Sequence, residues 1–93
     1  MIVRLSLPAR QDVLQLIRQA VLEGQAVTRI QQLADAAAST ATMPRRFPVV
    51  GWSGMTRLHK SKSPPYVIIF EIRATEVFIL RIVHHRGDWA SLI

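Results

Sequence analysis

The hydrophobic pattern of the first half predicts one strand and two helices. Residues 2–7 alternate apolar and polar side chains with a period of two, which is typical of a half-buried strand. Ser6 and Pro8 mark the start of a helix, and Gly24 is the residue that ends it. A second amphipathic helix is predicted over residues 25–40. The residues expected on its buried stripe are Ala26, Ile30, Leu33, Ala34 and Ala37.

The second half changes to the pattern of a sheet. Residues 42–54 read as a loop with a short strand at 49–50, and residues 55–60 alternate as a strand. After the break at 61–65, residues 66–72 and 77–83 form apolar strands that a tight reversal at 73–76 pairs antiparallel. This order predicts a single α+β domain over residues 1–93. Its helical hairpin packs on one face of a mainly antiparallel sheet of about four strands.

Composition narrows the class of protein. The chain has 93 residues, of which 49% are hydrophobic and 19% are charged, so it supports a folded core rather than disorder. The absence of cysteine excludes disulfides and thiolate metal sites. No apolar run approaches the length of about 18 residues that a membrane span needs, and the N-terminal segment lacks the features of a signal peptide. We therefore expect a cytoplasmic protein with no membrane partner.

The charge is positive and unevenly distributed. The net charge is +6, and residues 45–93 carry eight of the twelve basic groups but three of the six acids. Ten of the basic residues are arginines, which bind phosphate and carboxylate groups in bidentate geometry. The partner expected from this distribution is RNA, DNA or an acidic protein. The alternative is that the charge serves solubility alone.

The sequence offers no metal, cofactor or serine-hydrolase signature. The histidines are His59, His84 and His85, and the adjacent pair would point to opposite faces of a strand. No Gly-x-Ser-x-Gly elbow or glycine-rich phosphate loop is present. We expect Trp52 and Trp89 to cover the core of a thin sheet rather than to serve as exposed anchors.

A basic cluster is the strongest candidate for function. Period-two alternation places Arg81 on one face with Ile79, Val83 and His85, where it would bind a ligand or pair with an acidic group across the sheet. Arg57 and Lys60 would point to opposite faces of the neighbouring strand, and Lys62 lies in the loop that follows.

Metal-free RNA cleavage needs cations at the phosphate and groups that transfer protons. The cations available for this chemistry are Arg57, Lys60, Arg81 and Arg86. The groups available for proton transfer are His84, His85 and Asp88, although the favoured role of Asp88 is to hold Arg86 or His85 in place.

The closing segment resembles a known family. Residues 66–89, YVIIFEIRATEVFILRIVHHRGDW, are similar to the closing hairpin of the RelE/ParE toxin superfamily. In that superfamily an aromatic residue opens a strand, and the next strand ends in a Val-x-His-x-Arg-Arg-Asp-type motif. Here Gly87 stands where a second arginine is frequent. The SLPAR start of the first helix and a turn at 44–46 agree with the same layout.

The resemblance implies the toxin of a type II toxin–antitoxin pair. RelE-like members cleave mRNA on the ribosome, whereas ParE-like members poison DNA gyrase. RelE-like members place an arginine after the aromatic residue of the central strand and a tyrosine in a C-terminal helix. Here Val67 follows Tyr66 and no later tyrosine occurs. Arg86 matches the arginine after the closing strand, and Lys60 matches the basic strand position only approximately. The strand arginine is frequent in ParE-like members too, so its loss does not by itself indicate gyrase. The short form that ends in His-x-Arg-x-Asp resembles the ParE-like branch more closely, and this branch is favoured.

We expect a ParE-like toxin that binds DNA gyrase as a protein, needs no cofactor or metal, and forms a hetero-oligomer with an acidic antitoxin. The residues expected to bind the target or antitoxin are Arg57, Lys60, Lys62, Arg81, Arg86 and Trp89. The alternative is a ribosome-dependent mRNA endonuclease, in which the catalytic residues would be Arg86, His85, His84 and Asp88. A third alternative is a non-toxic relic or plain binding module.

Overall fold

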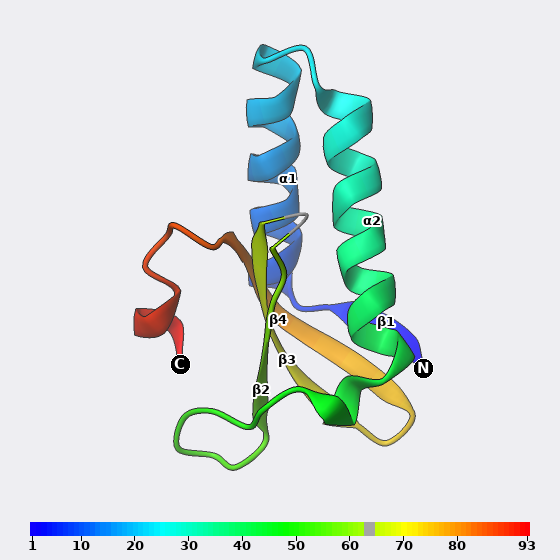
Figure 1. Ribbon diagram of the computed structural model, residues 1–93, viewed down its shortest axis with the longest axis vertical. Coiled ribbons are helices and arrows are strands. Elements are labelled where there is room, and N and C mark those ends of the chain that lie inside the picture. The colour runs from blue at the N-terminus through cyan, green and yellow to red at the C-terminus, as the bar shows by residue number, and fades with distance from the viewer. Residues whose placement is uncertain (63–64) are drawn as a thin grey trace.

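The computed structural model describes residues 1–62 and 65–93, so the predicted break at 61–65 includes two residues, 63 and 64, outside the described part. Figure 1 shows the order of elements along the chain. The helices and strands are β1 (Ile2–Leu5), α1 (Leu7–Leu22), α2 (Ala26–Thr42), β2 (Thr56–Lys60), β3 (Tyr66–Arg73) and β4 (Glu76–His84). Short 3-10 turns span Pro44–Arg46 and Trp89–Leu92. The α+β prediction is confirmed, and neither described helix is long and apolar enough to cross a membrane.

The four strands form one mixed sheet in the order β1-β4-β3-β2. The pairs β2–β3 and β3–β4 are antiparallel, as their short connections require, whereas β1 lies parallel to β4. A parallel arrangement is open to β1 because the helical hairpin, rather than a tight turn, follows it. The predicted strand at 49–50 is a single bridge between Val49 and Arg57, at the outer edge of β2.

Both ends of α1 have the caps that the sequence predicts. The Ser6 side chain accepts a hydrogen bond from the backbone N–H of Ala9 at 3.1 Å, which satisfies one of the free donors at the helix start. Gly24 adopts a φ of +70°, and the Gln25 N–H bonds to the Ala20 carbonyl at 2.7 Å. This is the 6→1 bond of a Schellman motif, which a residue without a Cβ favours. The chain then turns directly into α2.

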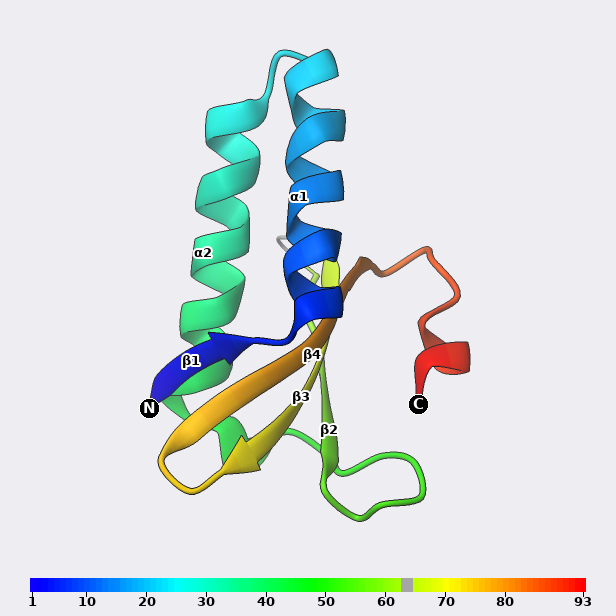
Figure 2. The same ribbon diagram turned by 180° about the vertical axis from the view of Figure 1, so that it is seen from behind.

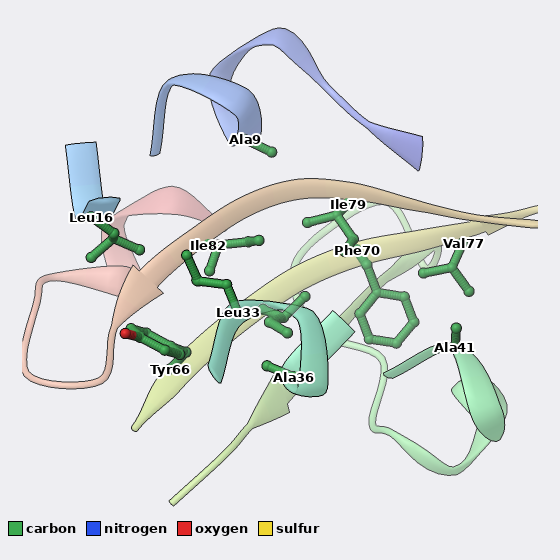
Figure 3. Close-up of a cluster of buried hydrophobic side chains, with 11 residues drawn as sticks. Ala9, Leu16, Leu33, Ala36, Ala41, Tyr66, Phe70, Val77, Ile79 and Ile82 are labelled. Atoms are coloured by element: carbon green, nitrogen blue, oxygen red, sulfur yellow. The ribbon is translucent and has the colours of Figure 1, made fainter. Parts of the chain in front are cut away.

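The main hydrophobic core, here called the helix-side core, lies between the hairpin and one face of the sheet (Figures 1 and 2). The strands contribute alternate residues of β3 and part of β4, and the helices contribute small and branched side chains. Figure 3 shows ten of these side chains by name: Ala9, Leu16, Leu33, Ala36, Ala41, Tyr66, Phe70, Val77, Ile79 and Ile82.

A smaller far-side cluster covers the other face of the sheet. Its fully packed members are Leu58, Val67 and Ile69. The C-terminal turn covers them with Trp89 and Leu92. Adjacent residues of β3 therefore belong to different cores, which confirms the prediction that this strand is buried on both faces.

Two expectations about side-chain direction are wrong. On α2, Ala36 and Thr40 are buried, whereas Ala34 is exposed and Ile30 is 50% exposed. The buried stripe is rotated because the sheet covers the 33–36–40 side of the helix. Trp52, expected to cover the core, is fully exposed.

The grouping of Ile79, Arg81, Val83 and His85 on one face is also wrong. The register shifts at Ile69 and Phe70, which pair with Arg81 and Ile79 and leave Leu80 as an extra residue. Ile79 consequently belongs to the helix-side core, whereas Val83 packs on the far-side cluster. Simple alternation fails across the bulge.

Candidate functional site

A hollow at the far side of the sheet brings together part of the predicted basic cluster. It has a volume of about 270 Å³ and is lined by Lys60, Ser61, Lys62, His85 and Trp89; it is called here the Lys60–Trp89 hollow. The first three residues lie at and after the end of β2, and the other two follow the end of β4. The hollow therefore joins segments from either side of β3.

Trp89 serves both the core and this hollow. Its half-buried ring packs on the far-side cluster, as a core-covering tryptophan was expected to do. The Nζ atom of Lys60 lies 4.5 Å from the centre of the same ring, a cation–π contact worth about 0.5–1 kcal/mol at an exposed site. The contact holds a positive charge against an aromatic wall, which suits a negatively charged group on a ligand or partner.

The histidine pair is arranged differently from the expectation. β4 ends at His84, so strand alternation stops before His85, and the two rings lie 4.9 Å apart with an interplanar angle of 30°. The prediction that they point to opposite faces is wrong. The Nδ1 atom of His85 lies 3.2 Å from the Pro65 carbonyl, which can only accept a hydrogen bond. Nδ1 is therefore the donor, and Nε2 has no hydrogen-bond partner among residues 1–62 and 65–93.

His84 has no comparable free acceptor. His84 is an exposed residue, but its ring meets the edge of Tyr66. The partial loss of water around the ring is the main cause that lowers the pKa of His84, and the charges of His85 and Arg86 lower it further. The backbone N–H of Arg86 donates to Nδ1 of His84 at 3.2 Å. Both effects favour the neutral ring with its proton on Nε2.

Arg86 and Asp88 lie on the exposed turn beyond β4. Within residues 1–62 and 65–93, no ion pair joins Asp88 to Arg86 or to His85. The main-chain carbonyl of Asp88 accepts a hydrogen bond from the Ser91 hydroxyl at 2.8 Å, at the start of the terminal 3-10 turn. Arg86 is an exposed cation that directly follows His85 in the chain.

Arg81 lies outside the hollow and is held by an acid on α1. Its Nε and Nη2 atoms donate to the two carboxylate oxygens of Asp12 at 2.7 and 2.9 Å. The same carboxylate accepts the Ile82 N–H at 3.1 Å, at the edge of β4 that β1 leaves open. This hydrogen bonding raises the pKa of Arg81. The arrangement is the ion pair considered as an alternative, except that the acid comes from a helix rather than from across the sheet.

Arg57 is likewise separated from Lys60. Its Nη1 atom donates to the carbonyls of Phe47 and Arg45 at 2.8 and 3.1 Å. These bonds tie Arg57 to the segment before β2, whereas Lys60 contacts Trp89 on the far side. The two residues point to opposite faces, as expected. Of the residues proposed for binding, the structure brings Lys60, Lys62 and Trp89 together and leaves Arg57 and Arg81 elsewhere.

Sequence reasoning missed an apolar groove, here called the interhelical groove. Its volume is about 350 Å³. The lining residues come from β1, both helices and β4: Val3, Leu5, Val13, Ile17, Ile30, Leu33, Ala34, Ala37 and Ile82. Ile30 and Ala34 were assigned to the buried stripe of α2. The available signal was that this stripe held more apolar positions than one narrow helix–sheet contact can cover.

Among the described residues, no group of three or more His, Cys, Asp or Glu side chains is arranged to hold a metal ion.

Comparison with known proteins identifies the family. The family model for the ParE toxin of the type II toxin–antitoxin system parDE matches residues 3–89. Among solved structures, a chain from "Chromosomal ParDE TA system from P. aeruginosa" is similar with a TM-score of 0.73 and 16% sequence identity, covering 90% of this chain and 95% of that one. At this identity the likeness concerns the fold. No curated protein sequence matches. Because the family match spans nearly the whole length, the chain belongs to the ParE toxin family of type II toxin–antitoxin systems.

Proposed function

We propose that this chain is a growth-inhibiting toxin that acts by binding DNA gyrase and is neutralised by a cognate antitoxin. Membership of the ParE toxin family supports the toxin assignment. The observation that favours a protein target over RNA cleavage is the dispersal of the cations. Arg81 is bound by Asp12 and Arg57 by backbone carbonyls, so neither stands beside His85.

This dispersal bears on the chemistry because RNA cleavage needs its groups at one phosphate. Cations must neutralise the charge that develops there while one group removes a proton and another supplies one. The Lys60–Trp89 hollow has two lysines and one histidine nitrogen, and His84 is engaged through Nδ1. Protein binding makes no such demand, since cations and a tryptophan contribute wherever they meet complementary groups.

Pulse labelling of DNA and protein synthesis just after induction in bacteria tests the target. The gyrase proposal expects DNA synthesis to fall first while translation continues, and the purified chain to inhibit supercoiling by gyrase. An early fall in translation with unaffected supercoiling would reject it.

A second candidate, a ribosome-dependent mRNA endonuclease, is favoured by the free Nε2 of His85 beside two lysines. It expects cleavage of translated message in phase with codons. The substitution His85→Ala should abolish that cleavage, and intact message during growth arrest would exclude it. A soluble, folded chain that is harmless when overexpressed would instead support the relic or binding-module alternative.

The interhelical groove is the surface that we propose for the antitoxin. Its apolar walls suit the apolar face of a partner helix. The adjacent strand β1 lies at the edge of the sheet, where a partner strand can pair with it. An antitoxin with apolar anchors and acidic flanks would fill the groove and complement the net charge of +6.

The substitution Ala34→Glu tests this surface because it places a charge on the groove wall at an exposed position. We expect antitoxin affinity to fall by roughly tenfold or more while toxicity is kept. The matched control is Thr28→Glu, an exposed position of the same helix that does not line the groove. Equal effects of the two variants would contradict groove binding and indicate general charge attraction.

A further inference from the structure

The loop between Val50 and Thr56 carries the most exposed large apolar side chain of the described residues. Trp52 is 101% exposed, and its neighbours Val49 and Met55 are about half exposed. Tryptophan contributes the largest apolar area of any residue and is enriched where proteins meet. A fully exposed tryptophan does nothing for the core, so its position needs another explanation.

The loop has a defined conformation. The Val50 N–H bonds to the Thr56 carbonyl at 2.7 Å and closes its base. The Ser53 hydroxyl accepts the N–H groups of Met55 and Thr56 at 3.0 and 3.3 Å. Trp52 is thus presented by a hydrogen-bonded turn, which lowers the entropy cost of immobilising it in a complex.

Glycines make this turn possible. Gly51 and Gly54 have φ values of +77° and +72°, a region that residues with a Cβ rarely adopt. A Cβ on Gly51 would also lie 3.8 Å from the terminal residue Ile93, so the C-terminus packs beside the base of the loop. The two glycines bend the chain on either side of Trp52, so that its side chain faces outward.

A hollow beside the loop is cationic as well as apolar. Arg45, Gly54, Met55, Arg57 and Ile72 line this hollow of about 250 Å³, and this lining includes two arginines and no acid. Arg45 is exposed, and Arg57 is fixed by the carbonyls of Arg45 and Phe47. Tryptophan, methionine and arginine are among the residues enriched at protein interfaces, and tryptophan and arginine are enriched in their hot spots.

We propose that Trp52 is the anchor of a docking surface for an acidic protein target, separate from the antitoxin surface. The proposal rests on the proposed function, since it concerns the target of the toxin. Trp52 would enter an apolar pocket of the target, and Arg45 and Arg57 would meet carboxylates around it. A lone aromatic ring suits one protein pocket better than a nucleic-acid strand, whose successive bases stack on several rings.

The position of the loop in the fold supports two separate surfaces. The loop lies at the end of the molecule opposite the tip of the helical hairpin, in both views (Figures 1 and 2). None of its residues lines the interhelical groove. It also adjoins the Thr56 end of β2, whereas the Lys60–Trp89 hollow is at the Lys60 end.

The test compares Trp52→Ala with the control Leu22→Ala, which removes another exposed apolar side chain, 89% exposed, at the hairpin tip. Each variant is induced in bacteria and scored for growth inhibition against measured toxin level, and each purified variant is titrated with antitoxin. We expect Trp52→Ala to need roughly 30-fold more toxin for equal inhibition, with antitoxin affinity unchanged. Leu22→Ala should match the wild type in both. Arg45→Glu should weaken inhibition in the same direction as Trp52→Ala.

Several outcomes would overturn the proposal. The first is that Trp52→Ala remains fully toxic. The second is that Trp52→Ala loses antitoxin affinity to the same extent as toxicity. The third is that Trp52→Ala loses binding to single-stranded RNA rather than binding to a protein. The labelling experiment separates this proposal from the gyrase assignment. If translation falls first and Trp52→Ala is inactive, gyrase is wrong and the docking surface stands. If DNA synthesis falls first and Trp52→Ala stays toxic, the docking surface is wrong and gyrase stands. A harmless wild-type chain would overturn both.

Discussion

The two faces of the sheet differ in how they are covered. The helical hairpin covers one face with the larger core and leaves the interhelical groove open beside it. The other face carries three fully packed residues under a short C-terminal turn. The Lys60–Trp89 hollow lies on the thinly covered side. The helix-side core has eleven buried residues and the far-side cluster has three, so the first carries most of the stability and the second face keeps charged side chains accessible.

The largest expected effect compares two neighbouring isoleucines. Ile68 and Ile69 are adjacent on β3 and equally buried, but they belong to the helix-side core and the far-side cluster respectively. We expect Ile68→Ala to lower the free energy of unfolding by about 4 kcal/mol and Ile69→Ala by about 3 kcal/mol, because the lighter cover can collapse into the cavity. Denaturant titration measures both. Equal losses, or the reverse order, would mean that the two faces are packed alike.

A smaller effect concerns the acid that joins α1 to the open edge of β4. Asp12→Ala removes the partner of both the Arg81 guanidinium and the Ile82 N–H. We expect a loss of about 2 kcal/mol in the same titration, since hydrogen bonds to charged groups are stronger than neutral ones. Asp35→Ala is the control, because among the described residues this exposed acid bonds to the Gln31 side chain alone, and its loss should change stability by under about 0.5 kcal/mol. If Asp12→Ala leaves the free energy of unfolding unchanged, the Asp12–Arg81 ion pair does not stabilise the fold.

The pH dependence of stability should further distinguish the helix-covered side of the sheet from the far side. His59 is buried there, with Nδ1 2.8 Å from the Thr40 hydroxyl and its ring stacked on Phe47. Burial, and then the charge of Arg46, lowers the pKa of His59 below its usual value of 6.5. The unfolded chain therefore binds a proton first as the pH falls, so stability is complete above about pH 6.5 and declines below it.

Unfolding measured between pH 5 and 7.5 should show this decline, and His59→Gln should reduce its slope. The comparison variant is His84→Gln, because the pKa of His84 is also lowered but the residue lies at an exposed position. We expect His84→Gln to change the slope of stability against pH less than His59→Gln does. A slope that is unaffected by His59→Gln would indicate that another group controls the pH dependence.

The smallest effect on stability is expected at the accessible cations. The double variant Lys60→Ala with Arg86→Ala loses one cation–π contact and one exposed charge, so stability should change by about 1 kcal/mol or less. Toxicity should be abolished, as measured by colony counts after induction. The control removes two exposed arginines of α1, Arg10 and Arg18. A folded and fully toxic double variant would refute the role of the basic cluster.

Local patterns were sufficient where neighbours in sequence decide the structure. The cap of α1 at Ser6, the glycine at position 24 and the tight turn after Arg73 were all predictable, because each depends on a few adjacent residues. The bulge at Leu80 was not, because an extra residue is defined only by the partner strand. That single residue reversed the expected grouping of Ile79 and Val83.

The sequence by itself determined the kinds of element, their order, the hairpin pairing of the last strands and a positive charge concentrated in residues 45–93. Only the tertiary structure decided which of those charges are free. Arg81 meets Asp12 across 69 positions, while Lys60 meets Trp89 from the other side of β3. It also decided that Ile30 lines a groove and that Trp52 faces outward. Periodicity reports which side of an element is apolar, but the surface that meets this side depends on packing between distant parts of the chain.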